Sequence, residues 1–298
     1  MATPKRAESL DELKEITKPL ITARGVKAGL SLQLRPTDVV ITPFGKSGTT
    51  WTQQIVHTLR TQGDMDFDDI SRVVPWIETS TDLGLDLGAD QKANPRAFKS
   101  HLTYEAVPKG GRYINVMRDP GDVAVSMFKF EEGWFLEPGA VSLDEFVQHD
   151  FLVSLRYFDH LRSWWSQRNN PAVLFLCYED MLENPADTIT RIAEFIGIEL
   201  DGALRTMTLK HSSIEFMLQH KDRFDDALLR ARSEAVCNLP AGSDSAKVRR
   251  GIAGESAGLS NESIQALKTV WQTEITATLG YEDYPAMRQA LNNSAQEF

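Results

Sequence analysis

The chain has 298 residues, a formal net charge of −10 and a hydrophobic content of 42%. It can bury a core of its own, and its acidic balance argues against a nucleic-acid surface, which needs a basic patch that neutralises phosphates. No apolar run approaches the roughly 18 residues that span a bilayer, the N-terminus has no signal-peptide pattern, and two cysteines are too few for a disulfide framework. We therefore expect one domain over residues 1–298, in the cytoplasm, with no membrane or nucleic-acid partner.

Short apolar runs alternate along the chain with segments of helical spacing, which predicts an α/β fold with a mainly parallel sheet. We expect strands at residues 38–43, 96–101, 112–117 and 172–177.

Helices are predicted from the 3.6-residue spacing of apolar side chains and from capping residues. They are expected directly after the first strand and at residues 120–130, 142–167, 185–197 and 260–280. Residues 220–247 are charged and then rich in glycine and serine, so they could form a mobile lid or an inert surface excursion.

The segment KSGTTW, residues 46–51, joins the first strand to the next helix. A glycine-containing turn that enters a helix presents successive backbone N–H groups and the positive end of the helix dipole, which suits a phosphate or sulfate. Lys46 adds a positive charge, and neighbouring hydroxyls add further donors. The nucleotide-triphosphatase loop requires a glycine where Val40 stands, so we predict an anion-binding loop of a different kind.

This loop and further motifs in the same order resemble the sulfotransferases that use 3′-phosphoadenosine 5′-phosphosulfate (PAPS). KSHL at 99–102 resembles the family's Lys-x-His-Leu strand end, and RDPGDVAVS at 118–126 resembles its 3′-phosphate element. RRGIAG at 249–254 resembles its C-terminal Arg-Lys-Gly-x-x-Gly motif, and LFLCYED at 174–180 its adenine-contacting strand. The resemblance covers about residues 38–255 and implies a P-loop-like parallel sheet flanked by helices.

The resemblance also implies contacts with PAPS. The loop would bind the 5′-phosphosulfate, the arginine motifs would bind the 3′-phosphate through charge-assisted bonds, and Trp51 and Tyr178 would contact adenine. In HSSIEFM at 211–217 an isoleucine replaces the family's phenylalanine. Trp51 could equally be a core residue, and Ser212 with Glu215 could equally form a capping box. The expected PAPS-binding residues are Lys46, Ser47, Gly48, Thr49, Thr50, Trp51, Arg118, Ser126, Tyr178, Ser212, Ile214, Arg249, Arg250 and Gly251.

Three residues are expected to act in catalysis. His101 stands at a strand end and is predicted to be the general base, since its unperturbed pKa lies near neutrality. Lys46 is predicted to stabilise the charge that develops on the leaving oxygen, with Lys99 as a second donor. The scheme requires no metal, and the sequence has no cluster of metal-ligand spacing.

The acceptor is expected to be a small apolar or aromatic alcohol or phenol. Residues that fall in the family's acceptor-lining segments suggest this, although they could equally belong to the core: Phe44, Trp76, Trp134 and Phe135. Two alternatives remain, an ATP-dependent kinase or other P-loop nucleotide hydrolase, and a module that binds PAPS or its product, 3′,5′-adenosine bisphosphate (PAP), without chemistry. The family's animal dimer segment is absent, so the oligomeric state is open, and the C-terminal ending resembles bacterial members.

Overall fold

The computed structural model describes residues 3–245 and 247–295. Its centre is a four-stranded sheet in the order β2-β1-β3-β4, in which every pairing is parallel. The strands are β1 (Val39–Ile41), β2 (Ala97–Lys99), β3 (Arg112–Met117) and β4 (Val173–Cys177). All four lie within the predicted runs, which confirms the α/β fold with a parallel sheet.

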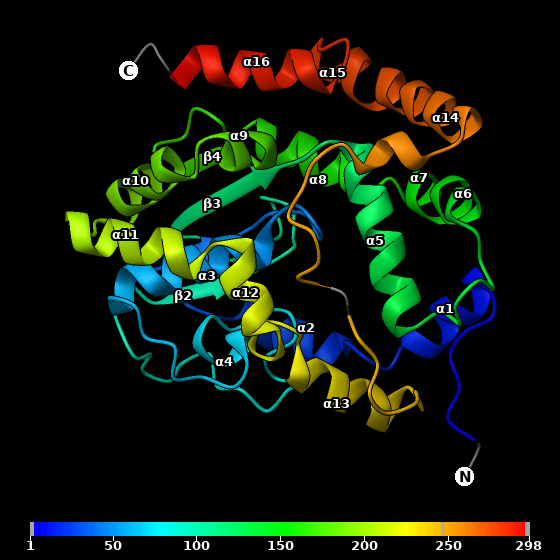
Figure 1. Ribbon diagram of the computed structural model, residues 1–298, viewed down its shortest axis with the longest axis horizontal. Helices are drawn as coiled ribbons and strands as arrows, with labels where there is room; N and C mark the ends of the chain where they lie inside the picture. Colours follow the sequence, from blue (N-terminus) through cyan, green and yellow to red (C-terminus); the bar gives the residue numbers. More distant parts are fainter. Residues whose placement is uncertain (1–2, 246, 296–298) are drawn as a thin grey trace.

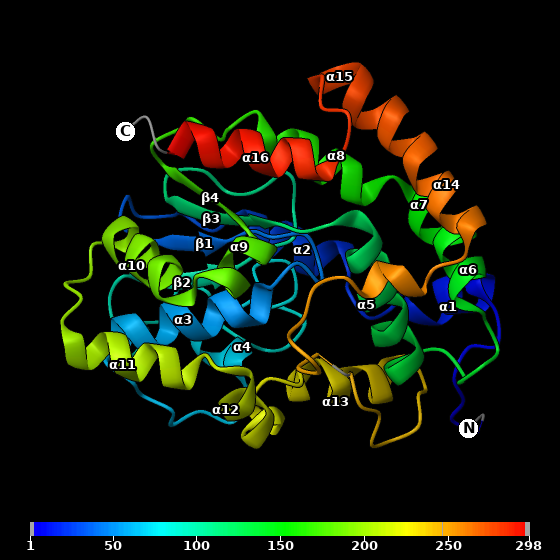
Figure 2. The same cartoon turned by 45° about the horizontal axis from the view of Figure 1, so that its top comes forward.

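Both faces of the sheet are covered by helices, and the residues of β1 alternate between two hydrophobic cores. Val39 and Ile41 belong to the core under α3 (Thr49–Thr61), α10 (Pro185–Ile196) and α11 (Gly202–His211), which pack on one another. Val40 belongs to the core on the other side, with α8 (Arg156–Trp165) and α16 (Tyr284–Ala295). Figure 2 shows these two helix layers above and below the sheet. Burial on both faces explains why the strands are continuously apolar.

Three predicted motifs meet at one edge of the sheet because β1 lies between β2 and β3. In this parallel arrangement the carboxyl ends of the strands lie together, so the segments that follow Ile41, Lys99 and Met117 become neighbours. The sheet therefore assembles the site from segments that are up to about 80 residues apart.

The helix α5 (Pro120–Trp134) begins directly after β3, with Asp119 as its N-cap and proline in its first turn. Both features were predicted, although the helix continues four residues beyond Phe130. Two N-terminal helices, α1 (Leu10–Thr17) and α2 (Ala23–Leu30), were not predicted. In Figure 1, α1 lies at the end of α5 that is farther from the sheet.

The predicted continuous helix over 142–167 is wrong. It is divided into α6 (Leu143–Phe146), a π-helical turn (Val147–Phe151), α7 (Leu152–Ser154) and α8, and Leu155 has a left-handed backbone with a φ of 53°. The apolar side chains of Phe146, Val147, Phe151 and Leu152 are buried. They recur after five residues, so a π turn, with its longer repeat, keeps them on one face.

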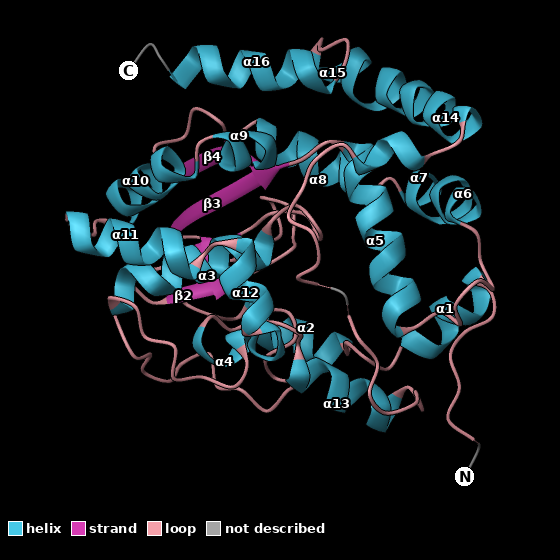
Figure 3. Cartoon of the chain, viewed as in Figure 1, coloured by secondary structure: helices cyan, strands magenta, loops and turns pink. Residues whose placement is uncertain are grey.

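The remaining helices complete the layers seen in Figure 3. A second π-helical turn interrupts the predicted helix 260–280, which is otherwise divided between α14 and α15. The helices and helical turns whose bounds have not yet been given are α4 (Ile70–Val73), α9 (Tyr178–Glu183), α12 (Ile214–Gln219), α13 (Ala227–Val236), α14 (Asn261–Trp271), the π turn Gln272–Thr276, α15 (Ala277–Leu279), and the 3₁₀ turns Lys221–Arg223 and Glu255–Gly258.

The segment 220–247 is packed against the rest of the protein, and Ala246 within it lies outside the described residues. Phe224 is fully buried, and Leu229 and Leu239 are nearly so. The segment also contains α13, so it is not the unstructured surface excursion that its composition allowed.

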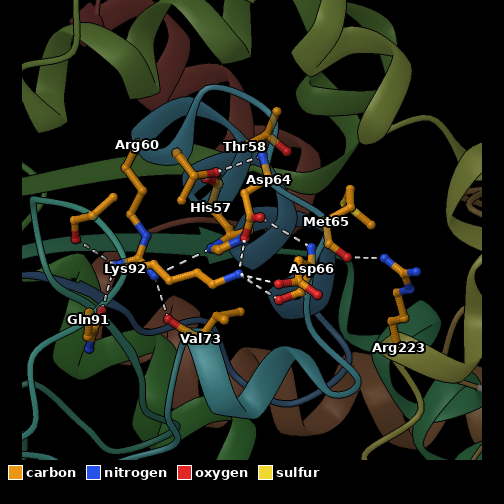
Figure 4. A network of polar contacts seen from close by, with 12 residues as sticks. His57, Thr58, Arg60, Asp64, Met65, Asp66, Val73, Gln91, Lys92 and Arg223 are labelled. Carbon is orange, nitrogen blue, oxygen red and sulfur yellow. Dashed lines mark hydrogen bonds and ion pairs between the residues drawn. The ribbon is translucent and has the colours of Figure 1, made fainter.

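A polar network fixes the C-terminal end of α3 to the chain that leads into β2 (Figure 4). The Arg60 guanidinium is buried and donates to the carbonyl oxygens of Val73 and Pro95 and to the Gln91 side chain. Lys92 Nζ donates to Asp64 Oδ2 at 2.9 Å. Because these carbonyls and amides satisfy a buried charge, α3 keeps a fixed position under the loop at its N-terminal end.

Candidate functional site

A cavity of about 930 Å³ opens at the carboxyl edge of the sheet. Its walls come from the loop between β1 and α3, the ends of β2 and β3, α5, α9 and α12, and the segment 247–251. The N-terminal α1 also contributes, so segments from across the chain enclose it.

The loop at residues 45–49 presents unsatisfied donors to this cavity. Gly48 caps α3 in the left-handed conformation with a φ of 88°, and Lys46 also has a positive φ of 68°. The first turn of an α-helix leaves N–H groups without intrahelical partners. The side-chain oxygens of Ser47 and Thr49 are buried without a hydrogen-bond partner. Such donors, next to a helix N-terminus, fit a bound phosphate or sulfate ester.

Three lysines and one aspartate surround the same end of the cavity. Burial and, to a smaller extent, the charge of Lys247 lower the pKa of Lys46 and of Lys99 to about 7. Asp226 is buried and forms an ion pair with Lys247. Burial would raise the pKa of Asp226, but Lys247 and Lys99 together bring it below its usual value. The Asp226 carboxylate thus balances only part of the charge of these three lysines, which leaves the region suited to an anion.

Trp76 holds Lys99 and His101 on the cavity wall. Its backbone forms a parallel bridge with Lys99, and the Lys99 Nζ lies 4.0 Å from the centre of the indole ring. The Trp76 and His101 rings are 5.1 Å apart in an edge-to-face arrangement. All three line the cavity, so two of the predicted catalytic residues and one predicted acceptor-lining residue are adjacent.

Two hydrogen bonds fix the orientation of His101. Its backbone N–H donates to the buried carboxylate of Glu78 at 2.7 Å, and its Nδ1 lies 2.7 Å from the carbonyl oxygen of Pro43. Because a carbonyl oxygen can only accept, Nδ1 carries the proton and Nε2 of the neutral ring keeps its lone pair. Burial, with the charge of Lys99, lowers the pKa of His101 well below 6.5. The ring is therefore neutral near pH 7.

The predicted 3′-phosphate residues come together at the start of α5. Arg118 donates to the carbonyl oxygens of Lys46 and Ile252, both at 3.0 Å, and its guanidinium lies 4.3 Å from the centre of the Tyr178 ring. The Asp122 carboxylate accepts hydrogen bonds from the backbone N–H groups of Gly254 and Ser256, and these bonds hold the 249–254 motif against α5. Ser126 and Arg249 line the same part of the cavity.

The predicted adenine residues also lie on this wall. The Trp51 and Tyr178 rings meet edge to face at 5.8 Å, and Ile214 lies against Gly251, where an added Cβ would be 3.2 Å from its side chain. Ser212 lines the cavity, but its hydroxyl donates to the Thr208 carbonyl at 2.7 Å. The alternative of a capping box between Ser212 and Glu215 is wrong, since Ser213 is the N-cap of α12 and accepts from the Phe216 N–H.

Four predicted site residues lie outside the cavity lining. Trp134 is fully buried in the core, stacked on Phe135, and its Nε1 donates to Ser233 at 3.0 Å. Phe44 packs edge to face against Tyr157 and His160. The Arg250 side chain is exposed to solvent, and the Ser47 side chain is fully buried. Phe135, by contrast, does line the cavity.

Sequence reasoning missed several cavity residues. Asp226 and Lys247 fall in the segment predicted as a lid but had no assigned role, and Glu131 of α5 had none. The wall formed by α1 was also missed. No local motif marks these residues, because their place at the site depends on contacts between distant segments.

The chain is similar to known proteins along most of its length. A family model described as "Sulfotransferase domain" matches residues 36–278. Sulfotransferase 1B1 from Canis lupus familiaris is 31% identical over 235 residues, covering 74% of this chain and 77% of that protein. Sulfotransferase 1E1 from Bos taurus is 33% identical over 198 residues, covering 62% and 67% respectively.

Solved structures share the fold. A retinol dehydratase in complex with retinol and PAP superposes with a TM-score of 0.67 at 22% identity, covering 91% of this chain and 97% of that one. A mouse sulfotransferase complexed with PAP gives 0.65 at 18% identity, covering 92% and 95%. Within the described residues, no helix has the length and apolarity needed to cross a membrane, and no group of three or more potential ligands could hold a metal ion.

Proposed function

This chain belongs to the sulfotransferase domain family and is a PAPS-dependent sulfotransferase, and on that premise we propose that it sulfates a hydroxyl of a small apolar or aromatic acceptor with His101 as general base. The observation that carries the assignment of the base is the hydrogen bond from His101 Nδ1 to the Pro43 carbonyl. It leaves Nε2 of a neutral ring to accept the hydroxyl proton.

The donor residues are proposed to act as follows. The N–H groups and hydroxyls of the 46–51 loop hold the phosphosulfate, and Arg118 with Arg249 holds the 3′-phosphate. Arg250 is exposed and is not part of the cavity lining, so we leave it out of the donor site. When bound, PAPS supplies the activated sulfuryl group. The buried, unpartnered hydroxyl of Thr49, which lines the cavity, supports this fit.

Lys46 and Lys99 are proposed to stabilise the charge that develops on the leaving oxygen. Both lysines line the cavity beside Lys247, and the buried carboxylate of Asp226 balances only part of their positive charge. An anionic donor would favour their protonated forms, so binding and charge stabilisation use the same groups. Lys247 is a third cation at this position and is proposed to join them.

The acceptor is proposed to lie between α1, α5 and Trp76. Leu13, Leu20, Ile21, Met127, Phe130 and Phe135 line this part of the cavity with apolar surface. This surface supports an apolar or aromatic body for the acceptor, with its hydroxyl directed to His101. Trp134 and Phe44 support this part of the cavity by packing behind it and do not contact the acceptor.

The two alternatives are less well supported. A nucleotide hydrolase would leave the oriented His101 without a role, and a module that only binds PAPS needs no base at all. We also propose a cytoplasmic location, a single domain, and a lid role for residues 220–247, whose Leu229 and Lys247 line the cavity. Slower proteolysis of residues 241–245 in the presence of PAP would support the lid, and an unchanged rate would contradict it. The bacterial source and the oligomeric state stay open.

The test of the base is the His101→Ala variant. Transfer from PAPS should fall by about 10²–10⁴-fold, as for a lost general base, whereas PAP affinity should barely change. His160→Gln provides the matched control, because this buried histidine lies near Phe44 but outside the cavity lining. Normal turnover by His101→Ala would remove the assignment. Magnesium-dependent ATP turnover, measured in the same samples, would revive the hydrolase alternative.

A further inference from the structure

Glu131 lines the part of the cavity that we assign to the acceptor, and its carboxylate has no hydrogen-bond or ion-pair partner among the described residues. It lies on α5 one turn after Met127 and next to Phe130, both of which line the same cavity. No residue in the described part of the chain hydrogen-bonds to the Glu131 side chain or forms an ion pair with it. Burial raises its pKa to about 7, and the nearby Asp150 carboxylate raises it further, while Arg156 and Lys46 lower it.

The other charged groups on this wall differ from Glu131 in having partners or in facing water. The Asp150 carboxylate lies 3.7 Å from Lys14 Nζ of α1. Lys14 and Arg156 are exposed, so water screens their charges and weakens any pairing with a ligand. Glu131 is thus the acid on this wall that has no hydrogen-bond or ion-pair partner within the described part of the chain.

An unsatisfied polar group in a binding cavity indicates what the ligand carries. A partly buried acceptor without a partner is unfavourable, and more so when it is charged, so native proteins seldom retain one without a reason. Leu13, Leu20, Phe130 and Phe135 give this wall apolar surface, and no described donor forms a hydrogen bond with the Glu131 carboxylate. A ligand ammonium group would satisfy the carboxylate and gain from the low local dielectric.

We propose that the natural acceptor carries a protonated amine in addition to its hydroxyl, and that Glu131 binds this amine. This inference rests on the proposed function, because it places the hydroxyl at His101. The apolar side chains hold the body of the acceptor between the two groups, so Glu131 determines specificity and takes no part in proton transfer.

The experiment compares acceptors that differ only by an amine. With PAPS as donor, kcat/KM is measured for tyramine and 4-ethylphenol, and for 6-aminohexan-1-ol and hexan-1-ol. We expect the wild-type protein to prefer the aminated member of a pair by at least about tenfold, mainly through a lower KM, since tenfold corresponds to about 1.4 kcal/mol, a plausible value for one such pair. In Glu131→Gln, which keeps the size of the side chain, the ratio should fall to near one.

Glu132→Gln is the matched control. Glu132 is the next residue in the chain, it lies outside the cavity lining, and its carboxylate accepts from the Gly139 N–H at 3.3 Å. It should leave the preference unchanged. A wild-type protein without preference for the amine, or a preference that persists in Glu131→Gln, would overturn the inference. Either result would leave the proposed function standing, which would fail only if no hydroxyl acceptor were sulfated. Because the wild-type ratio is itself decisive, the test does not depend on the variant folding.

Discussion

Replacement of Gly48 by alanine tests whether the anion loop depends on its backbone conformation. Gly48 has a φ of 88°, and a Cβ there would lie 2.9 Å from Cδ2 of Tyr178. For a residue other than glycine the left-handed conformation costs about 1–2 kcal/mol, and an overpacked contact adds about 1–3 kcal/mol. The lower entropy of the unfolded chain returns about 0.4–1 kcal/mol. We expect a net loss of about 2–4 kcal/mol in the free energy of unfolding.

The same substitution should weaken donor binding. A displaced Tyr178 ring would disturb Arg118, whose guanidinium packs on it at 4.3 Å. The free energy of unfolding is measured by urea titration, and PAP affinity by calorimetry.

Gly45→Ala is the matched control in the same loop. Gly45 lies outside the left-handed region, and its Cβ would approach only the end of the flexible Met127 side chain, at 3.1 Å. Its stability should change by less than about 1 kcal/mol. Equal effects of the two substitutions on stability and on PAP affinity would refute the reasoning about Gly48.

Three further predictions follow from the site. The pKa of Lys46 and of Lys99 is lowered to about 7, so between pH 7 and 10.5 the unfolded chain binds more protons than the folded one, and the stability of the free protein should rise with pH in this range. PAP affinity should fall from pH 7 to 9, because the two lysines lose their charge. Stability and PAP affinity that do not change with pH, as measured by calorimetry, would contradict this. Arg249→Ala should weaken PAP binding by about 1.5–3 kcal/mol, whereas Arg250→Ala, outside the lining, should have little effect, and equal losses would place both arginines at the phosphate. Trp134→Ala should lower the free energy of unfolding by about 3–5 kcal/mol; a changed acceptor KM with unchanged stability would return Trp134 to the acceptor wall.

The strands and the anion loop could be predicted because they depend on short stretches of chain. A parallel strand buried on both faces is a continuous apolar run, and the turn into α3 is determined by Gly48 and the hydroxyl residues around it. The cap at Asp119 and the proline after it likewise act on their own helix. The order of the motifs was enough to identify the family before any contact was known.

Other features depend on contacts that a local pattern does not contain. Whether Trp134 or Phe135 faces the cavity is decided by how α5 packs, since the two rings are neighbours in the chain and stack on each other. The break at Leu155 likewise depends on the core that receives the side chains of the π turn.

The sequence by itself thus predicted a parallel sheet, an anion loop and the proposed base, because each strand and each of these motifs is a short stretch of chain. Only the tertiary structure brought Asp226 and Lys247 beside Lys46, about 180 and 200 residues away along the chain, and left Glu131 on the cavity wall without a hydrogen-bond or ion-pair partner among the described residues. Ion pairing and burial act through space and not along the chain, and for this reason no spacing of residues announces them.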